Sequence, residues 1–183
     1  MMESNKRQKT KKCLENAMVK LLSDHTFDQI TTVKLTQEAD ISRSSFYTHY
    51  KDKFDMIDHY QDRLFHTLDY IFDKHEGHLE ATITEIFEFL KREPLLAALL
   101  SENGTQEIQQ FIRKRLQVLL ENEWQGRYSH KLFQDKEKKY AAIYLSNAFL
   151  GVYQLWIAQG KKETSHSMAR FLMKMLKFSG IED

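Results

Sequence analysis

Residues that break helices are scarce in this chain. The 183 residues include a single proline, Pro94, and only 6 glycines. These few breakers lie between segments in which apolar residues recur every three or four positions, the spacing of an amphipathic α-helix. No segment shows the sustained alternation of apolar and polar residues that is typical of a β-strand. The sequence therefore predicts an all-α fold.

The apolar spacing and the breakers together predict where the helices lie. A first amphipathic helix includes Leu14, Met18 and Leu22, and its apolar stripe is expected to pack with Phe27 and Ile30. A long helix is expected from residue 53 to about residue 75, with Gly77 ending it. Further helices are expected at residues 79–92, 95–101, 105–128, 135–159 and 165–178.

Residues 32–53 form the most informative segment, because they contain two helix starts joined by a tight turn. Thr32 is predicted to cap a short helix that starts at Val33. Asp40 lies where the chain must reverse, and Asp is among the few residues that tolerate left-handed backbone angles. Ser42 is predicted to cap a second short helix, which runs from residue 43 to about residue 49. This layout is typical of a helix-turn-helix.

Helices joined by a short turn are common in soluble proteins, so the side chains decide what this pair does. Helical spacing turns Leu35, Ala39, Ile41, Phe46 and Tyr50 inward. A purely structural helix of this length normally carries Glu, Lys and Gln outward. The second short helix instead presents small hydroxyl donors, a tyrosine and a histidine, which fit against phosphate oxygens and base edges. These residues favour a DNA-reading role.

At this point the segment resembles the signature of the TetR-type transcriptional regulators in its run S-R-S-S-F-Y-T-H-Y-K-D-K, residues 42–53. The upstream run F-D-Q-I-T-T-V, residues 27–33, resembles that family's entry into its second helix, and the match covers roughly residues 6–64. The family usually has Gly in the turn, where this chain has Asp40. The resemblance implies a three-helix DNA-binding head, expected at residues 1–52, and a body of about six helices at residues 53–183 that binds a ligand and dimerises.

The same resemblance implies that the second short helix enters the major groove of double-stranded DNA. Arg43 is the candidate for a base contact, because its forked guanidinium can bridge a guanine edge. Lys53 is expected to hold the phosphate backbone. The full set of expected DNA contacts is Thr32, Arg43, Ser44, Ser45, Tyr47, Thr48, His49 and Lys53.

The formal net charge is only +1, so attraction to nucleic acid must be local. A local bias is present at the N-terminus, where five Lys and Arg residues at positions 6–12 face a single acid, Glu3. A basic arm beside the reading head is expected to contact phosphate, and a merely solvated helix start is the alternative.

The position of the ligand cavity expected in the body is less well defined by the sequence than the DNA-binding segment. TetR-type regulators usually hold a small molecule between the long connecting helix and the helices of the body. Aromatic and polar residues on the plausible lining helices are Tyr70, Phe87, Phe111, Trp124, Tyr144, Asn147 and Trp156. Ordinary core or interface packing is the alternative for each of them.

Residues 140–157 are apolar on nearly all sides, which predicts a helix covered by its own body on one side and by a second subunit on the other. Gly151 in mid-helix indicates a close helix crossing. Together with the last helix, this helix is expected to form the four-helix interface of a homodimer. The candidate interface residues are Gly151, Gln154, Met168, Phe171, Leu172 and Met175. A buried core helix in a monomer is the alternative.

Other function classes have little support in the sequence. The lone Cys13 excludes an intramolecular disulfide and a cysteine-cluster metal site. No catalytic spacing or phosphate-cradling glycine loop is present, so neither an enzyme nor a cofactor is expected, and the His and Asp residues near His59 are more typical of a hydrated helix surface than of a metal site. No signal peptide or membrane span is expected, and the cytoplasm is the natural location.

The sequence thus predicts a homodimeric regulator that binds a pseudo-palindromic operator, with half-sites about 34 to 36 Å apart or a multiple of that distance. A repressor released by a small-molecule effector is expected. The alternatives are a regulator of the same fold that works through a protein partner, and a small helical enzyme or metal protein.

Overall fold

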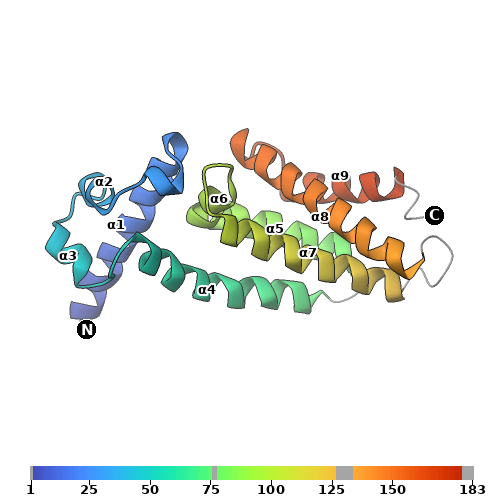
Figure 1. Ribbon diagram of the computed structural model, residues 1–183, viewed down its shortest axis with the longest axis horizontal. Coiled ribbons are helices and arrows are strands. Elements are labelled where there is room, and N and C mark those ends of the chain that lie inside the picture. Colours follow the sequence, from blue (N-terminus) through green and yellow to red (C-terminus); the bar gives the residue numbers. More distant parts are fainter. Residues whose placement is uncertain (1, 76–77, 127–133, 179–183) are drawn as a thin grey trace. The chain divides into compact units, whose positions relative to one another are not determined.

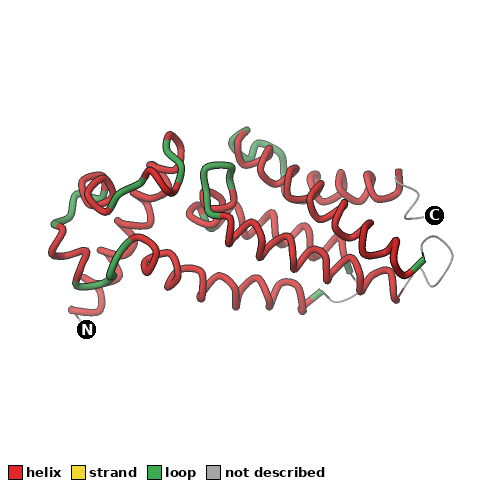
Figure 2. The backbone as a smooth tube through the Cα atoms, in the orientation of Figure 1, coloured by secondary structure: helices red, strands yellow, loops and turns green. Residues whose placement is uncertain are grey.

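The computed structural model describes residues 2–75, 78–126 and 134–178 of the chain. In these ranges the protein consists of nine α-helices and one short 3-10 helix, with no strand (Figures 1 and 2). The prediction of an all-α fold is therefore confirmed. The N-terminal helices are α1 (Met2–Asp24), η1 (Phe27–Gln29), α2 (Thr32–Glu38), α3 (Arg43–Tyr47) and α4 (Lys53–Lys74). The others are α5 (Leu79–Arg92), α6 (Pro94–Leu100), α7 (Gln106–Gly126), α8 (Asp135–Ala158) and α9 (Ser165–Phe178).

The predicted bounds of the helices agree with these elements to within two residues. Helices α5 and α9 have the predicted bounds, and α8 ends one residue earlier than predicted. Helix α3 ends at Tyr47, two residues before the predicted end, and Thr48 is its C-cap. Gly77, the predicted end of α4, lies outside the described residues.

The chain divides into two compact units. The first unit contains Met1–His66 and Glu93–Thr105, and the second contains Thr67–Arg92 and Gln106–Asp183. Helix α4 therefore contributes to both units, and α6 belongs with the N-terminal helices. The boundary expected at residue 52 marks the end of the helix-turn-helix and does not coincide with the limit of the first unit.

The core of the first unit is built where α1, α2 and α3 meet. Leu14 and Met18 from α1, Leu35 from α2 and Phe46 from α3 are all completely buried. Burial of side chains of this size contributes about 1.5 to 3 kcal/mol each, so these four residues hold the short helices that would not be stable alone. Helix α6 packs on α1, and Asn103, just after α6, donates a hydrogen bond to the carbonyl oxygen of Leu22.

The turn between α2 and α3 has a defined geometry that explains the aspartate in it. Asp40 has a φ of 52°, in the left-handed region. Its amide donates to the carbonyl oxygen of Gln37, and the amide of Ile41 donates to that of Thr36. These two bonds form the Schellman motif that commonly ends a helix, with Asp in the position that Gly usually occupies. The predicted backbone of Asp40 is confirmed.

In the second unit α8 packs mainly on α7 and α9 packs on α5. Phe87 of α5 lies against two residues of α8, with ring centroids 4.6 Å from Tyr153 and 4.8 Å from Trp156. A second Schellman motif ends α8, because the amides of Gly160 and Lys161 donate to the carbonyl oxygens of Ile157 and Trp156. The ring contacts thus hold α8 against α5, and the turn ends α8 before α9 begins.

Candidate nucleic-acid interface and body groove

Helix α3 presents its polar side chains to solvent because its apolar residues are held inside. Phe46 is completely buried and Tyr50 nearly so. The hydroxyl of Ser42 accepts a hydrogen bond from the amide of Ser45 at 3.1 Å, which confirms Ser42 as the N-cap. Arg43 is the first residue of the helix and is exposed, and 51% of the Tyr47 surface is exposed. Both side chains are therefore accessible to a base edge.

The remaining outward residues of α3 line one concave surface with residues of α1. Its volume is ≈ 450 Å³, and its lining residues are Arg7, Thr10, Ser42, Ser44, Ser45, Thr48 and His49. Four of the eight expected DNA contacts thus lie in one hollow beside a guanidinium group. Hydroxyl, imidazole and guanidinium donors directed at one hollow suit a phosphate oxygen. We call this hollow, lined by these seven residues, the α1–α3 pocket.

Arg7 and Thr10 were missed as specific site residues, although the N-terminal charge bias had included Arg7. The signal that places them is helical spacing. Counting back from the buried Leu14, residues 11, 10 and 7 are three, four and seven positions earlier on the same face of α1. Residues 7–11 precede the buried part of α1, and Arg7 and Thr10 line the hollow together with residues of α3. The expected basic arm is therefore helical from Met2 onward.

His49 is the titratable group of the α1–α3 pocket. Partial burial lowers the pKa of its imidazole below the usual value, and the positive charges of Lys11 and Arg7 lower it further. The Lys11 ammonium lies 5.7 Å from the centroid of the Tyr50 ring, which keeps it near this end of α3. In the free protein the neutral form of His49 is thus favoured.

Thr32 does not have the predicted capping role. The N-cap of α2 is Thr31, whose hydroxyl accepts from the amide of Lys34 at 3.2 Å, and Thr32 is the first residue of the helix. Two consecutive threonines lie at the start of this helix, and spacing alone does not show which of them is the cap. The half-buried Thr32 hydroxyl stays a candidate phosphate contact.

Lys53 lies in the interior, contrary to the predicted phosphate contact. Its ammonium group donates to the carbonyl oxygens of Phe27, Asp28 and Ile30 at 2.7, 3.0 and 2.8 Å. Only 9% of the residue is exposed, and the rings of Phe27 and Phe54 lie 4.7 and 5.0 Å from the ammonium. Burial lowers the pKa of Lys53, although Asp28 and Asp52 oppose this. All three N–H donors are used inside the protein, so we remove Lys53 from the expected DNA contacts.

Six of the seven residues expected to line a ligand cavity have described side chains, and these six do not come together. Phe87 and Trp156 are completely buried in the aromatic cluster with Tyr153, and Phe111 is half-buried. Tyr70 and Tyr144 are exposed, and the exposed Asn147 donates to the carbonyl oxygen of Ile143 on its own helix. The side chain of Trp124 lies outside the described residues. The predicted shared pocket is therefore not formed by these side chains.

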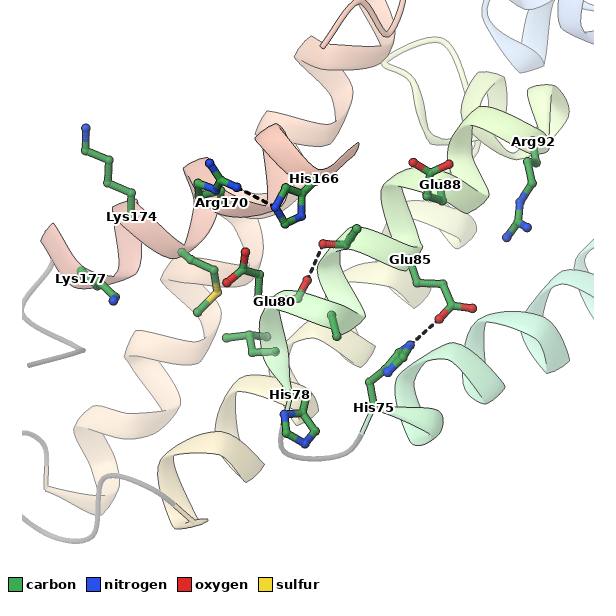
Figure 3. A pocket seen from close by; sticks show the side chains of 14 residues that line it. His75, His78, Glu80, Glu85, Glu88, Arg92, His166, Arg170, Lys174 and Lys177 are labelled. Carbon is green, nitrogen blue, oxygen red and sulfur yellow. Dashed lines mark hydrogen bonds and ion pairs between the residues drawn. The ribbon is translucent and has the colours of Figure 1, made fainter. Parts of the chain in front are cut away.

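The structure has instead an open groove between α5, α9 and the end of α4 in the second unit, with a volume of ≈ 1100 Å³. None of the six expected residues whose side chains are described lines it. Figure 3 shows charged side chains from α5 and α9 along its two sides. At its margin the carboxylate of Glu85 pairs with Lys74 at 3.0 Å and with His75. Partial burial raises the pKa of Glu85, but these two partners outweigh it and hold the pKa below its usual value. We call this feature the α5–α9 groove.

The residues expected at a dimer interface lie mostly on accessible faces of α8 and α9. Gly151 is exposed, and no atom outside its own helix backbone lies within 4 Å of a Cβ built on it. Phe171 is 44% exposed, while Gln154, Met168 and Met175 are half-buried and Leu172 is buried. The close crossing expected at Gly151 is thus not made within the described part of the chain.

The same helix α8 is long and apolar enough to cross a membrane on length and composition alone, over Lys136–Ala158. Core helices of soluble proteins pass this test too, and α8 packs one face against α7. Over the ranges that the structure describes, no three His, Cys, Asp or Glu side chains are grouped closely enough to hold a metal ion.

The comparisons with known proteins agree with this architecture. Residues 77–178, more than half of the chain, match a family model described as "Transcriptional regulator C-terminal region". No protein among those with curated functions matches by sequence. Among solved structures, a TetR transcriptional regulator from Streptococcus agalactiae is similar, with 22% identity, a TM-score of 0.66, and coverage of 96% of this chain and 98% of that chain.

Two further solved structures share the fold. The regulator FadR from Bacillus subtilis, in complex with stearoyl-CoA, is 14% identical with a TM-score of 0.62 over 90% of this chain and 96% of that one. The dihydroxyacetone kinase operon activator DhaS is 15% identical with a TM-score of 0.56 over 93% and 95%. At these identities the likeness establishes the fold.

Proposed function

Because this chain belongs to the TetR family of transcriptional regulators, we propose that it is a homodimer that binds a specific sequence of double-stranded DNA. The observation that carries the proposal is the α1–α3 pocket, together with Arg43 and Tyr47 exposed beside it. The pocket offers donors for a phosphate oxygen, and the two exposed side chains can reach base edges in the major groove. Phosphate contacts, which position the protein on DNA, and base contacts, which read the sequence, are thus proposed for different residues of α3.

The proposed contacts are those of the sequence prediction with one exchange. Arg7 of α1 takes the phosphate role that the sequence had assigned to Lys53. Arg43 reads a base, while the hydroxyl and imidazole groups of α3 divide between phosphates and bases. The complete proposed set is Thr32, Arg43, Ser44, Ser45, Tyr47, Thr48, His49 and Arg7.

The dimer is proposed from the exposed apolar side of α8 and α9. Tyr144, Leu155 and Phe171 are 70%, 58% and 44% exposed, and Gly151 lies between the first two with no side chain of its own. Large exposed apolar residues along one helix face mark an interaction surface, and the small residue allows another helix to approach. A second copy that covers this face removes it from water and places two reading helices on one DNA duplex.

Selection of bound sequences from random duplex DNA by the purified protein tests the proposal. A palindrome whose half-sites are about one helical turn apart, or a multiple of that, is the expected result. Recovery of a single unrepeated half-site would contradict the dimer, and recovery of no enriched sequence would contradict the DNA-binding role.

We further propose that a small-molecule effector bound in the second unit releases the protein from DNA, so that it acts as a repressor. The supporting observation is Tyr153, whose hydroxyl is completely buried and has no hydrogen-bond partner among the described residues. An unpaired buried hydroxyl is costly, and a ligand that accepts from it would relieve that cost. FadR of B. subtilis, which shares the fold, was solved with stearoyl-CoA.

Titration of candidate effectors against operator affinity tests this second step. An effector that binds the DNA-free form better must lower operator affinity, and the DNA must lower effector affinity by the same factor. The alternative is a regulator that works through a protein partner. DhaS, described as an operon activator, shows that the fold is not confined to proteins described as repressors.

A further inference from the structure

Along most of the α5–α9 groove the two sides carry opposite charges, and Arg92 adds a cation at the C-terminal end of α5. Glu80 and Glu88 lie on α5, and Arg170 and Lys174 lie on α9 (Figure 3). All four side chains are exposed to solvent. Within each helix the two charges are about two turns apart on α5, at a spacing of eight residues, and about one turn apart on α9, at a spacing of four, so each pair lies toward one side of its helix.

These charges do not neutralise one another across the groove. In the part of the chain that the structure describes, none of the four takes part in a salt bridge. Arg170 instead contacts the imidazole Nε2 of His166, one turn earlier on its own helix, at 2.7 Å. Glu85, the third acid of the groove, is already paired with Lys74 and His75. Two carboxylates on one side and two cations on the other thus stay available to a ligand.

Between the charged side chains the groove is lined by small and uncharged residues. Ala81 and Thr84 of α5 and Met173 of α9 line it, and the Thr84 hydroxyl is used within its own helix, where it donates to the carbonyl oxygen of Glu80 at 2.7 Å. With no charged group here and little side-chain volume on α5, a chain can lie along the groove without clashing. Its length also suits a chain, because Glu80 to Arg92 on α5 extends over about 18 Å at 1.5 Å per residue.

We propose that the α5–α9 groove binds an extended segment of a partner protein in which acidic and basic residues alternate. An extended chain directs successive side chains to opposite sides. In a segment that lies along the groove, every second residue therefore faces α9 and the residues between them face α5. Acidic side chains meet Arg170 and Lys174, and basic side chains meet Glu80 and Glu88. Five or six residues cover the available length of about 18 Å.

The groove lies on a different face of α9 from the surface proposed for the dimer. Residues 166, 170, 173, 174 and 177 line the groove, while Met168, Phe171 and Met175 lie on the opposite side of the helix. Between these two faces lie Ser165, Ala169, Leu172 and Leu176, which are buried. Because the groove face is separate, binding of a partner there does not require the dimer to open. Binding in the groove also does not require DNA.

Two labelled hexapeptides of identical composition test the proposal by fluorescence anisotropy. Glu-Lys-Glu-Lys-Glu-Lys can direct all acids to one side, whereas Glu-Glu-Glu-Lys-Lys-Lys cannot. We expect the alternating peptide to bind about tenfold more tightly than the block peptide, since several weak exposed ion pairs add together. Its affinity should fall as the salt concentration rises. Equal binding of the two peptides, or no binding of either, would overturn the proposal.

Variants that remove the charges of the groove test whether the peptide binds there. Arg170→Gln combined with Lys174→Gln, and separately Glu80→Gln combined with Glu88→Gln, should each weaken the alternating peptide by about tenfold. Lys162→Gln, an exposed lysine in the α8–α9 turn outside the groove, is the matched control and should bind normally. Peptide binding that survives both double changes would place the site elsewhere and overturn the proposal.

Two further measurements distinguish an extended segment from a small ligand in the groove, and groove binding from DNA binding. Displacement of the peptide by equal concentrations of free glutamate and lysine would indicate a small zwitterion as the occupant and would count against an extended segment. Duplex DNA affinity is measured on the same variants and should not change. If the wild-type protein binds DNA but shows no preference for the alternating peptide, only the groove inference is refuted. If it prefers the alternating peptide but does not bind DNA, only the proposed function is refuted.

Discussion

The ammonium group of Lys53 lies 2.7 Å from the carbonyl oxygen of Phe27, 26 positions earlier in the chain. Two more carbonyl oxygens of the same turn accept from it, so the first residue of α4 holds the loop between α1 and α2. The aromatic rings on either side shield these bonds from water. The start of α4 is thereby fixed within the helix-turn-helix unit.

Lys53→Met is expected to lower the free energy of unfolding by about 3 kcal/mol, because three carbonyl groups, two of them in buried hydrogen bonds, lose a charged donor. Urea denaturation followed by circular dichroism measures the change. Lys51→Met removes a nearby exposed lysine and serves as the control, with a change near zero. Equal stability of the two variants would show that the buried ammonium contributes nothing.

Arg43→Ala and Arg7→Gln should affect DNA binding in different ways. Loss of the Arg43 fork is expected to cost about 1 to 3 kcal/mol and to relax the preference at one base position. Loss of Arg7 should weaken binding on every sequence and reduce the salt slope by about one unit per site. Affinities on the selected operator and on single-base variants at several salt concentrations distinguish the two.

A uniform loss on all sequences for Arg43→Ala would assign that residue to the phosphate backbone. An unchanged salt slope for Arg7→Gln would remove α1 from the interface.

DNA binding is expected to take up a proton at His49. Burial, Lys11 and Arg7 lower the pKa of this imidazole in the free protein, while a phosphate in the α1–α3 pocket would favour the protonated form and raise the pKa in the complex. The complex then binds more protons than the free protein. Affinity therefore rises as pH falls through the pKa of the complex toward that of the free protein, by about tenfold for each unit between them.

Operator affinity measured between about pH 5.5 and 8 checks the linkage, since the usual pKa of histidine is about 6.5. His49→Gln should lose the extra pH dependence, and His66→Gln, an exposed histidine of α4, should retain it. Identical pH profiles for the wild type and His49→Gln would be evidence against a phosphate beside His49.

Asp40→Gly is expected to stabilise the protein by about 0.5 to 1 kcal/mol. Asp40 has the left-handed conformation of a Schellman turn, in which glycine has no steric cost. Thermal unfolding measures the shift. Asp40→Ala has a Cβ without the carboxylate, and it should be no more stable than the wild type. A loss of stability in Asp40→Gly would mean that the carboxylate itself supports the turn.

Leu155→Glu combined with Phe171→Glu should convert the dimer to a monomer, because both changes place charge on the face that a second copy is proposed to cover. Sedimentation velocity gives the oligomeric state. Tyr70→Glu changes another large exposed residue, 63% exposed on α4, and should leave the dimer intact. A monomeric wild type would exclude this interface.

The long helices were predictable from the sequence because each contains its own regularly spaced apolar residues. Helix α5 has seven buried residues on one face, and the apolar stripe of α9 is equally regular, so spacing alone gives their bounds. The cap of α2 was misplaced by one residue, because Thr31 and Thr32 are both suited to the position and only the hydrogen bond of Thr31 distinguishes them.

The candidate sites depend on contacts between parts of the chain that are far apart in the sequence. Such contacts could not be predicted from local patterns of residues. The burial of Lys53 depends on three carbonyl groups more than twenty positions away, and a basic residue at a helix start gives no sign of such a contact. The α5–α9 groove depends on the packing of helices more than seventy residues apart. In the sequence, the charged residues of each helix look like those of any solvent-exposed helix face.

The three faces of α9 also have a consequence for stoichiometry. If a second copy covers one side of this helix and the core covers another, the groove stays open on both subunits. A dimer would then hold two partner segments at once. A partner carrying two such segments would be tethered at both ends, and its apparent affinity would depend on the length of the linker between them.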